Sequence, residues 1–598
     1  MLKTCAAWDG TSTDTCTTLT SFDSSNPAIT AAALNITDAT QVTNLINWTR
    51  GQDVDNENTN LDAGLLPITN EMRPSVHGGV VHAQPAVIDY GGTIGTMAFY
   101  GDDQGVFHAV DGNQADTDGY ELWGFIAPEF YSKLNRQRTN SPAIAYPGVT
   151  GSPAPTPKDY FFDGSIGVFQ RSGTVWIYPS MRRGGRAIYG FDVSTPASPV
   201  IKWRKGCFTS DTTDDTVCST GWSGIGQTWS KPHIAYLSGY VDGSSNPKPV
   251  LVFGGGYDQC EDNHIVAGVL SQTPNCTGTR KGANIWFVDA NTGAILRTYP
   301  TNYSVPGDVA PLTDGNGNLT SVYASDTGGN VYRINVGSYD GTTFTSWSSN
   351  AAASNIILAS LSETNQARKF INGPSIISTA DYNVVLIGSG DREHPLVTDY
   401  ACNNYSTTLG AYVTNQFYML MDKPAGYPSP TLTTSSLVDV TAGTTTSATV
   451  SGTTTITNDN AGVITSSTQG WRFNFGQCEQ TVNEALTIAG ITYFGTNAPT
   501  AATGSSCAAN LGIARGYAVD FLTGNPGDNA PRSALYTGGG MPPSPVAGVV
   551  EVDGTKYPFC IGCITPGNSD CTSALQGCKV NINPTGSRFR AYWYREED

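Results

Sequence analysis

The stretch SVYASDTGGNVYRINV, from Ser321 to Val336, consists of two short apolar runs on either side of a Gly-containing turn. Runs of this length and composition around a tight turn predict an antiparallel β-hairpin. The second run closes on a polar residue, Asn335. If the same pattern recurs along the chain, it predicts a fold built from many small antiparallel sheets.

The hairpin pattern does recur. It appears again in MAFYGDDQGVFHAVDGN, from Met97 to Asn113, where Asp111 takes the closing place. The runs GGRAIYGFDV, ANIWFVDANTG, NQFYMLMD and RGYAVDFLTG close in the same way on Asp192, Asp289, Asp422 and Asp520. A carboxylate at a strand end accepts backbone N–H bonds and fixes a turn, so we expect a structural role for these residues.

A short opening strand, often introduced by Pro or a small residue, precedes these hairpins. Seven such strands are found: HAQPAVID, FFDGSIGVF, WSKPHIAYL, PGDVAPLTD, INGPSIIST, VNEALTIAG and MPPSPVAGVV. Short strands at recurring intervals predict a radial array of small sheets. The sequence therefore predicts an all-β fold, a modified seven-bladed β-propeller with long loop insertions.

The repeat predicts where the domains lie. Residues 1–76 lack it, and we expect them to form an N-terminal extension that packs on a propeller spanning 77–598. Within the extension, the spacing of Val42, Leu45, Ile46 and Trp48 predicts a short amphipathic helix. A Thr-rich insertion near 428–468 is expected to be either a β-ribbon or a flexible excursion.

Charge and hydropathy exclude some partners. The 598 residues carry 32 Lys and Arg against 50 Asp and Glu, a formal net charge of −18. That charge repels nucleic-acid phosphates and anionic lipid headgroups, so we expect no nucleic-acid partner. No stretch approaches the roughly 20 apolar residues of a transmembrane helix, so we expect no membrane span.

The thirteen cysteines include three pairs of near neighbours in polar loops: Cys5 with Cys16, Cys207 with Cys218, and Cys260 with Cys276. Local disulfides in such loops predict an exported protein that matures in an oxidising compartment. The pairing of Cys402, Cys478 and Cys507 stays open. Cys560, Cys563, Cys571 and Cys578 could form bridges or a zinc knuckle, and the oxidising setting favours bridges.

Several motifs taken in order resemble the PilY family of type IV pilus tip-associated adhesins and assembly factors. They are LINWTRGQDV, VVHAQPAVIDYGG, YGDDQGVFHAVDG with ELWGFI, SVYASDTGGNVYRINV, QGWRFNF and AYWYREED. The resemblance implies the family's C-terminal propeller domain, which a signal peptide and usually a von Willebrand A-like domain precede. It also implies passage through the periplasm to the cell surface or pilus tip. There the family promotes pilus extension against retraction with minor pilins and contacts host or abiotic surfaces.

The family's propeller often carries a calcium loop, D-x-D/N-x-D-G-x-x-D, before this hairpin. Its ligand positions fall in this sequence on Leu312, Asp314, Asn316 and Thr320, with the glycine at Gly317. Two carboxylates are missing, so the resemblance implies weak Ca²⁺ binding or a turn held by Asp314 alone.

A second acidic loop, DVDNENTNLD, offers another candidate calcium site. Asp53, Asp55 and Glu57 alternate there, with Asn58 at the turn and Asp62 at the end. Alternating carboxylates can face one ion, but the spacing to Asp62 is not that of a standard calcium loop. An ordinary solvated loop is the alternative interpretation.

Enzymatic functions find little support in the sequence. Repeats such as VDANTGAILR are similar to those of quinoprotein dehydrogenases, yet the adjacent cysteine pair common in those enzymes does not occur. The six histidines form no zinc-binding spacing, and no G-x-S-x-G or Walker loop is present. A glycan-binding or glycosidase propeller remains an alternative, since loop Trp and Tyr side chains could stack on sugars. We expect a non-enzymatic binding protein.

Overall fold

The structure is a computed structural model of the 598-residue chain. It describes residues 1–579 apart from 7–15, 17, 59–70, 114, 116–118, 147, 210–213, 263–264, 267–268, 271–273, 275, 277, 365, 380, 397–401, 403–411, 424–430, 442–444, 450–454, 459–461, 465–468, 502–509, 527–530, 553–554, 565–572, 574 and 576. Contacts divide the chain into two compact units. Among the described residues, unit 1 comprises Met1–Tyr257 and Asn284–Thr298, and unit 2 comprises Asp258–Ala283 and the residues from Tyr299 to Lys579.

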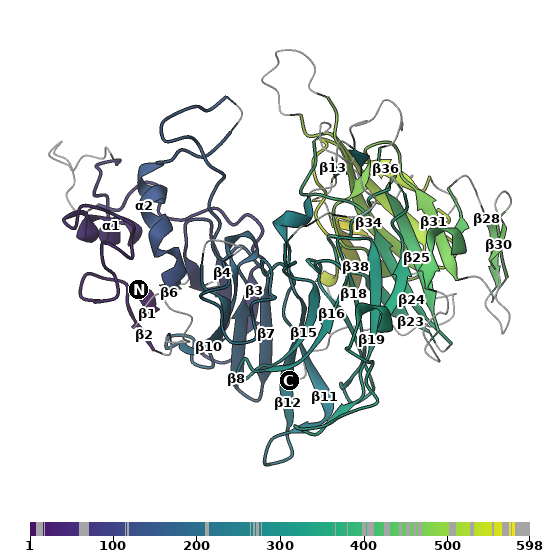
Figure 1. Cartoon of the computed structure of the whole chain (residues 1–598), viewed down its shortest axis with the longest axis horizontal. Coiled ribbons are helices and arrows are strands. Elements are labelled where there is room, and N and C mark those ends of the chain that lie inside the picture. Colours follow the sequence, from purple (N-terminus) through teal and green to yellow (C-terminus); the bar gives the residue numbers. More distant parts are fainter. Residues whose placement is uncertain are drawn as a thin grey trace. The chain divides into compact units, whose positions relative to one another are not determined.

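Unit 1 holds three blade-type sheets, in which strands that are neighbours in sequence pair antiparallel (Figure 1). Blade 1 has the order β2-β1-β6-β5-β4-β3, blade 2 the order β10-β9-β8-β7, and blade 3 contains β16-β15-β12-β11. The strands are β1 (Leu2–Cys5), β2 (Leu19–Ser21), β3 (Ala86–Asp89), β4 (Thr96–Gly101), β5 (Phe107–Asp111), β6 (Glu121–Phe125), β7 (Ile166–Arg171), β8 (Thr174–Pro179), β9 (Arg186–Asp192), β10 (Val200–Cys207), β11 (His233–Val241), β12 (Pro247–Gly254), β15 (Asn284–Asp289) and β16 (Ile295–Pro300).

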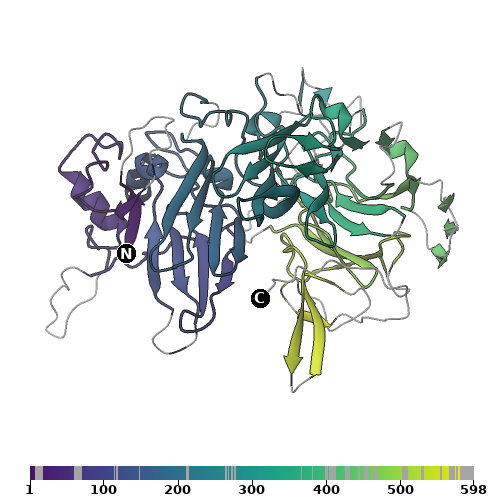
Figure 2. The ribbon, with the colours of Figure 1, turned by 90° about the horizontal axis from the view of Figure 1, so that it is seen from below.

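Unit 2 holds four more blades. Blade 4 is ordered β17-β18-β19-β22-β26, blade 5 β23-β24-β25-β31-β27, blade 6 β32-β34-β35-β36 with β33 also on β34, and blade 7 β37-β38-β39. Blade 7 supplies the yellow pair of arrows in Figure 2. The strands are β17 (Ala310–Thr313), β18 (Leu319–Ser325), β19 (Asn330–Asn335), β22 (Ile357–Ser360), β23 (Ser375–Ser378), β24 (Asn383–Gly388), β25 (Gln416–Asp422), β26 (Leu432–Thr433), β27 (Val438–Asp439), β31 (Gly470–Asn474), β32 (Gln480–Thr481), β33 (Leu486–Ile488), β34 (Ile491–Ala498), β35 (Ile513–Asp520), β36 (Ser533–Leu535), β37 (Val546–Val552), β38 (Thr555–Ile561) and β39 (Gly577–Lys579).

The seven opening strands found in the sequence form one strand in each of the seven blades: β3, β7, β11, β17, β23, β33 and β37. The hairpin of Ser321 to Val336 becomes β18 and β19, paired from Ser321 with Asn335 to Ser325 with Val331. Gly329 has a φ of +82° in the turn, a conformation that favours glycine. The predicted all-β fold with seven propeller-type blades is confirmed.

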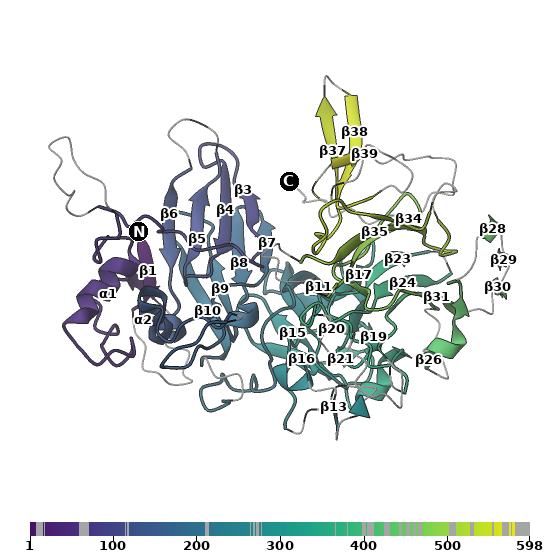
Figure 3. The same ribbon diagram turned by 90° about the horizontal axis from the view of Figure 1, so that it is seen from above.

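The blades are held together by their faces. Successive residues of a strand point to opposite sides of its sheet. In blade 2, Ile177 belongs to a buried cluster with Phe107 of blade 1, whereas its neighbour Tyr178 belongs to a cluster with Trp286 of blade 3. Figure 3 shows the strands of blades 1 and 2 side by side. Both faces of the sheet are therefore buried, and each fully buried side chain contributes about 1.5–3 kcal/mol.

Unit 2 repeats this arrangement. Val384 of β24 lies in a cluster with Phe494 of blade 6, and the next residue, Val385, lies in a cluster with Tyr323 of blade 4. Because both faces are buried, the strands appear in the sequence as continuous apolar runs such as VVLIG and lack a polar alternation. The loops and the sheet edges are therefore the parts of these blades that partners can reach.

Short parallel strands cover three outer blade edges. β1 pairs with β6, β26 with β22, and β27 with β31. An open edge presents unpaired N–H and C=O groups, and such strands satisfy part of them. Both β26 and β27 come from the predicted Thr-rich insertion, which also forms a separate sheet of β28 (Thr445–Thr449), β29 (Thr455–Asn458) and β30 (Gly462–Ile464).

The N-terminal segment carries the predicted helix, α1 (Gln41–Thr49). Its four predicted apolar positions join one cluster with Tyr131 and Leu134 of α2 (Tyr131–Thr139). Within the described residues no helix combines the length and the apolar character that a membrane crossing requires.

The predicted local disulfides are confirmed: Cys5–Cys16, Cys207–Cys218 and Cys260–Cys276. Cys402 pairs with Cys478, and Cys560 pairs with Cys563. Cys578 is also disulfide-bonded, which supports bridges over a zinc knuckle. Cys507 and Cys571 lie outside the described residues.

Candidate functional site

The first predicted calcium loop is the turn between β17 and β18. Asp314 Oδ1 accepts the backbone N–H groups of Asn316 at 2.8 Å and Asn318 at 2.9 Å. Slight burial raises the pKa of Asp314, but these hydrogen bonds outweigh it and lower the pKa overall. Thr320 Oγ1 donates to the Leu312 carbonyl at 3.2 Å. The carboxylate thus serves its own turn, and a calcium ion here stays a prediction.

In the second predicted calcium loop, the carboxylates lie apart from one another. Asp53 accepts the backbone N–H groups of Glu57 and Asn58, both at 2.8 Å. Asp55 instead forms a two-point ion pair with Arg138 of α2, at 2.8 and 2.5 Å. The oxygens of Asp53, Asp55 and Glu57 do not gather within 4.8 Å of one another. Asp62 lies outside the described residues.

Sequence reasoning missed two buried aspartates, each of which follows the second strand of its blade. Asp326 directly follows β18, is fully buried, and accepts hydrogen bonds from Asn330 Nδ2 at 2.9 Å and Tyr332 Oη at 2.6 Å. Burial raises its pKa to about 6, although these donors act in the opposite direction. Asp391 takes the corresponding place after β24 of blade 5. The signal was present, because YASD and GSGD both end apolar runs.

Asp391 belongs to a compact charged cluster of unit 2. Lys369 Nζ lies 2.8 Å from Asp391 Oδ2 and 3.1 Å from Asp262 Oδ1, and its side chain is fully buried. His394 Nδ1 lies 2.9 Å from the same oxygen of Asp391. Burial opposes ionisation of Asp391, but Lys369 and His394 hold its pKa well below the ordinary value. Asp262, Asp391 and His394 could ligate a metal by spacing, yet the Lys369 ammonium already contacts both carboxylates and offsets part of their charge.

Glu261, next to Asp262, is also buried. Its Oε2 accepts hydrogen bonds from the hydroxyls of Ser304 and Thr327, each at 2.5 Å, and Arg280 Nε lies 3.3 Å from Oε1. Burial raises the pKa of Glu261 to about 7, although the hydrogen bonds from the two hydroxyls act to lower it. Donors from different loops hold the carboxylate in place, which suits a structural brace.

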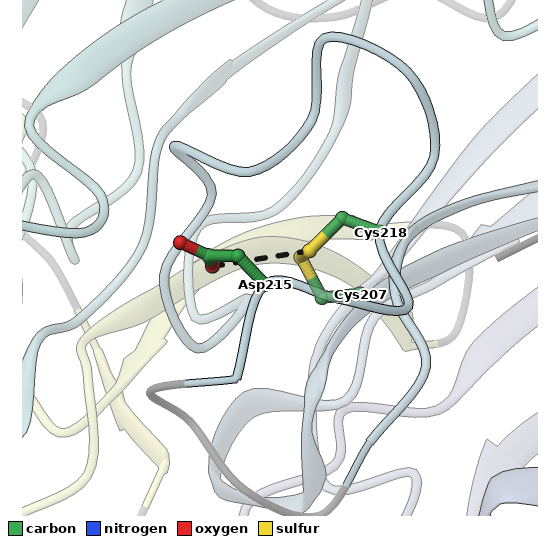
Figure 4. A group of neighbouring side chains, drawn as sticks. All are labelled: Cys207, Asp215 and Cys218. Carbon is green, nitrogen blue, oxygen red and sulfur yellow. Dashed lines mark hydrogen bonds between the residues drawn. A yellow bond between two sulfur atoms is a disulfide. The ribbon is translucent and has the colours of Figure 1, made fainter.

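A second group with metal-like spacing contains two cysteines. Figure 4 shows Asp215 beside the Cys207–Cys218 disulfide, with Asp215 Oδ1 3.9 Å from Cys218 Sγ. A disulfide has no thiolate, which is the form that binds metals. Asp215 also pairs with Arg186 at 2.8 Å. The group therefore closes a loop and offers no metal site while the disulfide is intact.

The closing aspartates mostly do what the sequence predicts. Four accept backbone N–H bonds from the turn that follows: Asp111 from Asn113, Asp192 from Ser194, Asp289 from Thr292, and Asp520 from Leu522. Asp422 differs, since it is buried against blade 4, 2.6 Å from Arg333 Nη1 and 2.5 Å from Tyr323 Oη. At this position the closing carboxylate joins two blades.

Blade 1 contains a buried histidine that is paired with two carboxylates. His108 is buried between Asp102, 3.2 Å from its Nε2, and Glu121, 2.7 Å from its Nδ1. Burial lowers the pKa of His108, but the two carboxylates overcome this and raise it to about 9. The exposed His77 stacks on the ring at 4.7 Å between centroids. His108 is thus a buried, ion-paired side chain of blade 1.

Comparisons with known proteins agree with the sequence motifs. No protein-family profile matches the chain. Over 250 residues it is 28% identical to the type IV pilus biogenesis factor PilY1 of Pseudomonas aeruginosa, in strains PAO1 and PAK alike. The match covers 40% of this chain but 17% of the relative, so it spans a small part of that protein.

Among solved structures, the C-terminal domain of Pseudomonas aeruginosa PilY1 is similar over 82% of this chain and 94% of its own, with a TM-score of 0.48 and 18% identity. A quinohemoprotein alcohol dehydrogenase from Comamonas testosteroni covers 83% of this chain and 68% of its own, with a TM-score of 0.37 and 13% identity. By its 28% identity over 250 residues, the chain is a distant homologue of the type IV pilus biogenesis factor PilY1, and the resemblance to the PilY family is confirmed.

Proposed function

We propose that this chain acts in type IV pilus biogenesis as a non-enzymatic protein at the cell surface or pilus tip. The observation that carries the proposal is its homology to PilY1, at 28% identity over 250 residues. The specific activities proposed are promotion of pilus extension against retraction, together with minor pilins, and attachment to host or abiotic surfaces.

The way the blades pack supports binding through loops. Blades 2 and 5 bury both faces against their neighbours, so their sheet faces are closed to partners. Loops on a rigid scaffold are common carriers of binding function. The disulfides fit an exported protein, since such bonds persist in oxidising compartments.

The buried carboxylates support a non-enzymatic role. A catalytic acid or base must reach its substrate with hydrogen-bonding capacity to spare. Asp326 and Glu261 instead accept bonds from neighbouring side chains, and Asp391 is paired with Lys369. We further propose that any calcium bound at Asp314 is held weakly, since that carboxylate serves its turn.

Deletion of the gene in the producing bacterium tests the pilus role. We expect fewer surface pili, reduced twitching and reduced attachment, all restored by a plasmid copy. Deletion in a strain unable to retract pili separates two roles, because piliation should return if the protein only opposes retraction. Unchanged piliation, twitching and attachment in the single deletion would contradict the proposal.

A further inference from the structure

A polar cleft of about 500 Å³ lies in unit 1, beside helix α2. Its size falls within the range of small-molecule sites. Its walls are mostly polar, and the lining residues are Asn35, Ser132, Lys133, Asn135, Arg136, Ser141, Pro142 and Asp159. A lining of this kind suits a ligand rich in hydroxyl groups and is unsuited to an apolar one.

Helix α2 supplies half of the lining. Ser132 and Asn135 are three residues apart, as are Lys133 and Arg136, and residues at this spacing are neighbours on a helix surface. The loop that follows α2 supplies Ser141. The cleft is thus built on a helix packed into the apolar cluster of α1, which gives it a firm floor.

Arg136 holds the cleft together and is fully engaged. Its guanidinium donates to Asp159 Oδ2 at 2.8 Å and to the carbonyls of Pro142, Thr156 and Pro157, each at 2.9 Å. These bonds fasten the loop to α2. Arg136 therefore has little capacity left for a ligand.

Lys133 presents the opposite case. Its side chain is 14% exposed, and its nearest charged partner is Asp159 Oδ1, 3.9 Å from Nζ. Among the described residues it donates no hydrogen bond within 3.5 Å. Its ammonium lies 5.8 Å from the centre of the Phe161 ring, which provides an apolar backing. A mostly buried ammonium with unused donors therefore lines the cleft.

Four uncharged polar side chains of the cleft also have hydrogen-bonding groups that are not used within the described residues. The amides of Asn35 and Asn135 and the hydroxyls of Ser132 and Ser141 make no hydrogen bond to other described residues, although each lines the cleft. Asn35 has a φ of +53°, which places it in a tight turn at the cleft wall. Together these groups offer both donors and acceptors to a ligand.

A second cleft of about 560 Å³ continues from the first, since Asn35 and Asn135 line both. Its charged residues are Asp38, Asp55, Glu57 and Arg138, so it is acidic overall. Lys133, Arg136 and Asp159 leave the first cleft with one net positive charge. A polyanion would be repelled by the second cleft, whereas one carboxylate can be placed beside Lys133.

We propose that the cleft beside α2 binds an acidic sugar, with the sugar carboxylate at Lys133 and its hydroxyls at Asn35, Asn135 and the two serines. A carboxylate gains a charge-assisted hydrogen bond from the ammonium. Ring hydroxyls both donate and accept, as do the amides and serines. The inference rests on the proposed attachment role for its biological meaning, but the binding itself is measured on the purified chain.

Three probes of related chemistry test the assignment by titration calorimetry or ligand-observed NMR: glucuronic acid, glucose and acetate. We expect glucuronic acid to bind about ten-fold more tightly than glucose, as one charge-assisted hydrogen bond allows. Acetate should bind more weakly still, because it lacks the hydroxyls. Equal binding of acetate and glucuronic acid would overturn the sugar assignment, and so would the absence of any glucuronic acid binding at millimolar concentration.

Two lysine variants locate the site. Lys133→Met keeps the apolar stem and should lower glucuronic acid affinity about ten-fold without affecting glucose. Lys158→Met is the matched control, since Lys158 pairs with Asp103 at 3.0 Å and does not line the cleft. Ser141→Ala should cost about three-fold. Unchanged affinity in Lys133→Met, with thermal unfolding like the wild type, would refute the site.

The two proposals can fail separately. A chain that binds glucuronic acid but leaves piliation unaffected when deleted would refute only the pilus role. A chain needed for piliation that binds no acidic sugar would refute only the cleft assignment.

Discussion

Lys369 and Lys133 both lie beside aspartates, but the two ammonium groups differ in how fully carboxylates surround them. Lys369 of unit 2 is fully buried, 2.8 and 3.1 Å from two carboxylates. Lys133 of unit 1 is 14% exposed and has one carboxylate at 3.9 Å, which Arg136 already occupies. The Lys369 ammonium therefore stabilises the fold, whereas the Lys133 ammonium still has hydrogen-bond donors available for a ligand.

The pKa values of the two side chains shift in opposite directions. Burial lowers the pKa of both lysines, because it disfavours the charged form. For Lys133 this effect prevails over Asp159, and its pKa falls. For Lys369 the charges of Asp391 and Asp262 outweigh burial, and its pKa rises. The number and proximity of carboxylates therefore separate a structural brace from a candidate binding group.

The largest effect is expected for Lys369→Met. The substitution leaves Asp391 buried without its main counter-charge, so the free energy of unfolding should fall by about 3–5 kcal/mol. Urea unfolding followed by tryptophan fluorescence measures it. The double variant with Asp391→Asn should recover part of the loss, because the uncompensated charge is then removed. A loss below about 1 kcal/mol in the single variant would show that Lys369 is no brace.

His108 is another buried cation, and like Lys369 it lies between two carboxylates. Its folded-state pKa of about 9 lies above the ordinary 6.5, so its stabilisation is complete below pH 6.5 and is lost as pH rises through 9. At 1.36 kcal/mol per pKa unit the loss amounts to up to about 3 kcal/mol. Denaturation midpoints measured from pH 6 to 10 should decline accordingly. In His108→Gln this decline should flatten, and an identical pH profile in the variant would contradict the assignment.

A smaller effect is expected where a carboxylate meets only backbone N–H groups. Asp314→Ala removes two such bonds from an exposed turn and should cost about 1 kcal/mol. Calcium should change the melting temperature of the wild type little, because the ligand set is weak. A clear rise with calcium that Asp314→Ala abolishes would show a true ion site at this turn.

The smallest effect on stability is expected for Lys133→Met, at less than about 0.5 kcal/mol. The ammonium makes one long contact, and its loss leaves Asp159 still paired with Arg136 at 2.8 Å. Urea unfolding beside Lys369→Met makes the comparison direct. Equal losses in the two variants would remove the distinction between them.

Local patterns in the sequence predicted much of the fold. The opening strands, the closing aspartates and the three local disulfides each depend on residues close together in the chain, where turn chemistry and strand period determine the outcome. Helix α1 followed for the same reason from Val42, Leu45, Ile46 and Trp48.

Contacts between distant segments could not be predicted in this way. Asp422 resembles the other closing aspartates in sequence, but it meets Arg333 because blades 4 and 5 pack face to face. Lys369 meets Asp262 across 107 residues. The cleft beside α2 joins Asn35 to Asp159, and no spacing rule connects them. The predicted calcium residues were read from local spacing alone, and the carboxylates of Asp53, Asp55 and Asp314 serve turns or Arg138.

Recovery of the protein with sheared pili tests the central claim most directly. A tagged chain expressed at native level should appear in the pilus fraction, and it should disappear from that fraction when the minor pilins are deleted. If the tagged chain stays entirely with the cell body or the medium in a normally piliated strain, the proposed place at the type IV pilus is wrong.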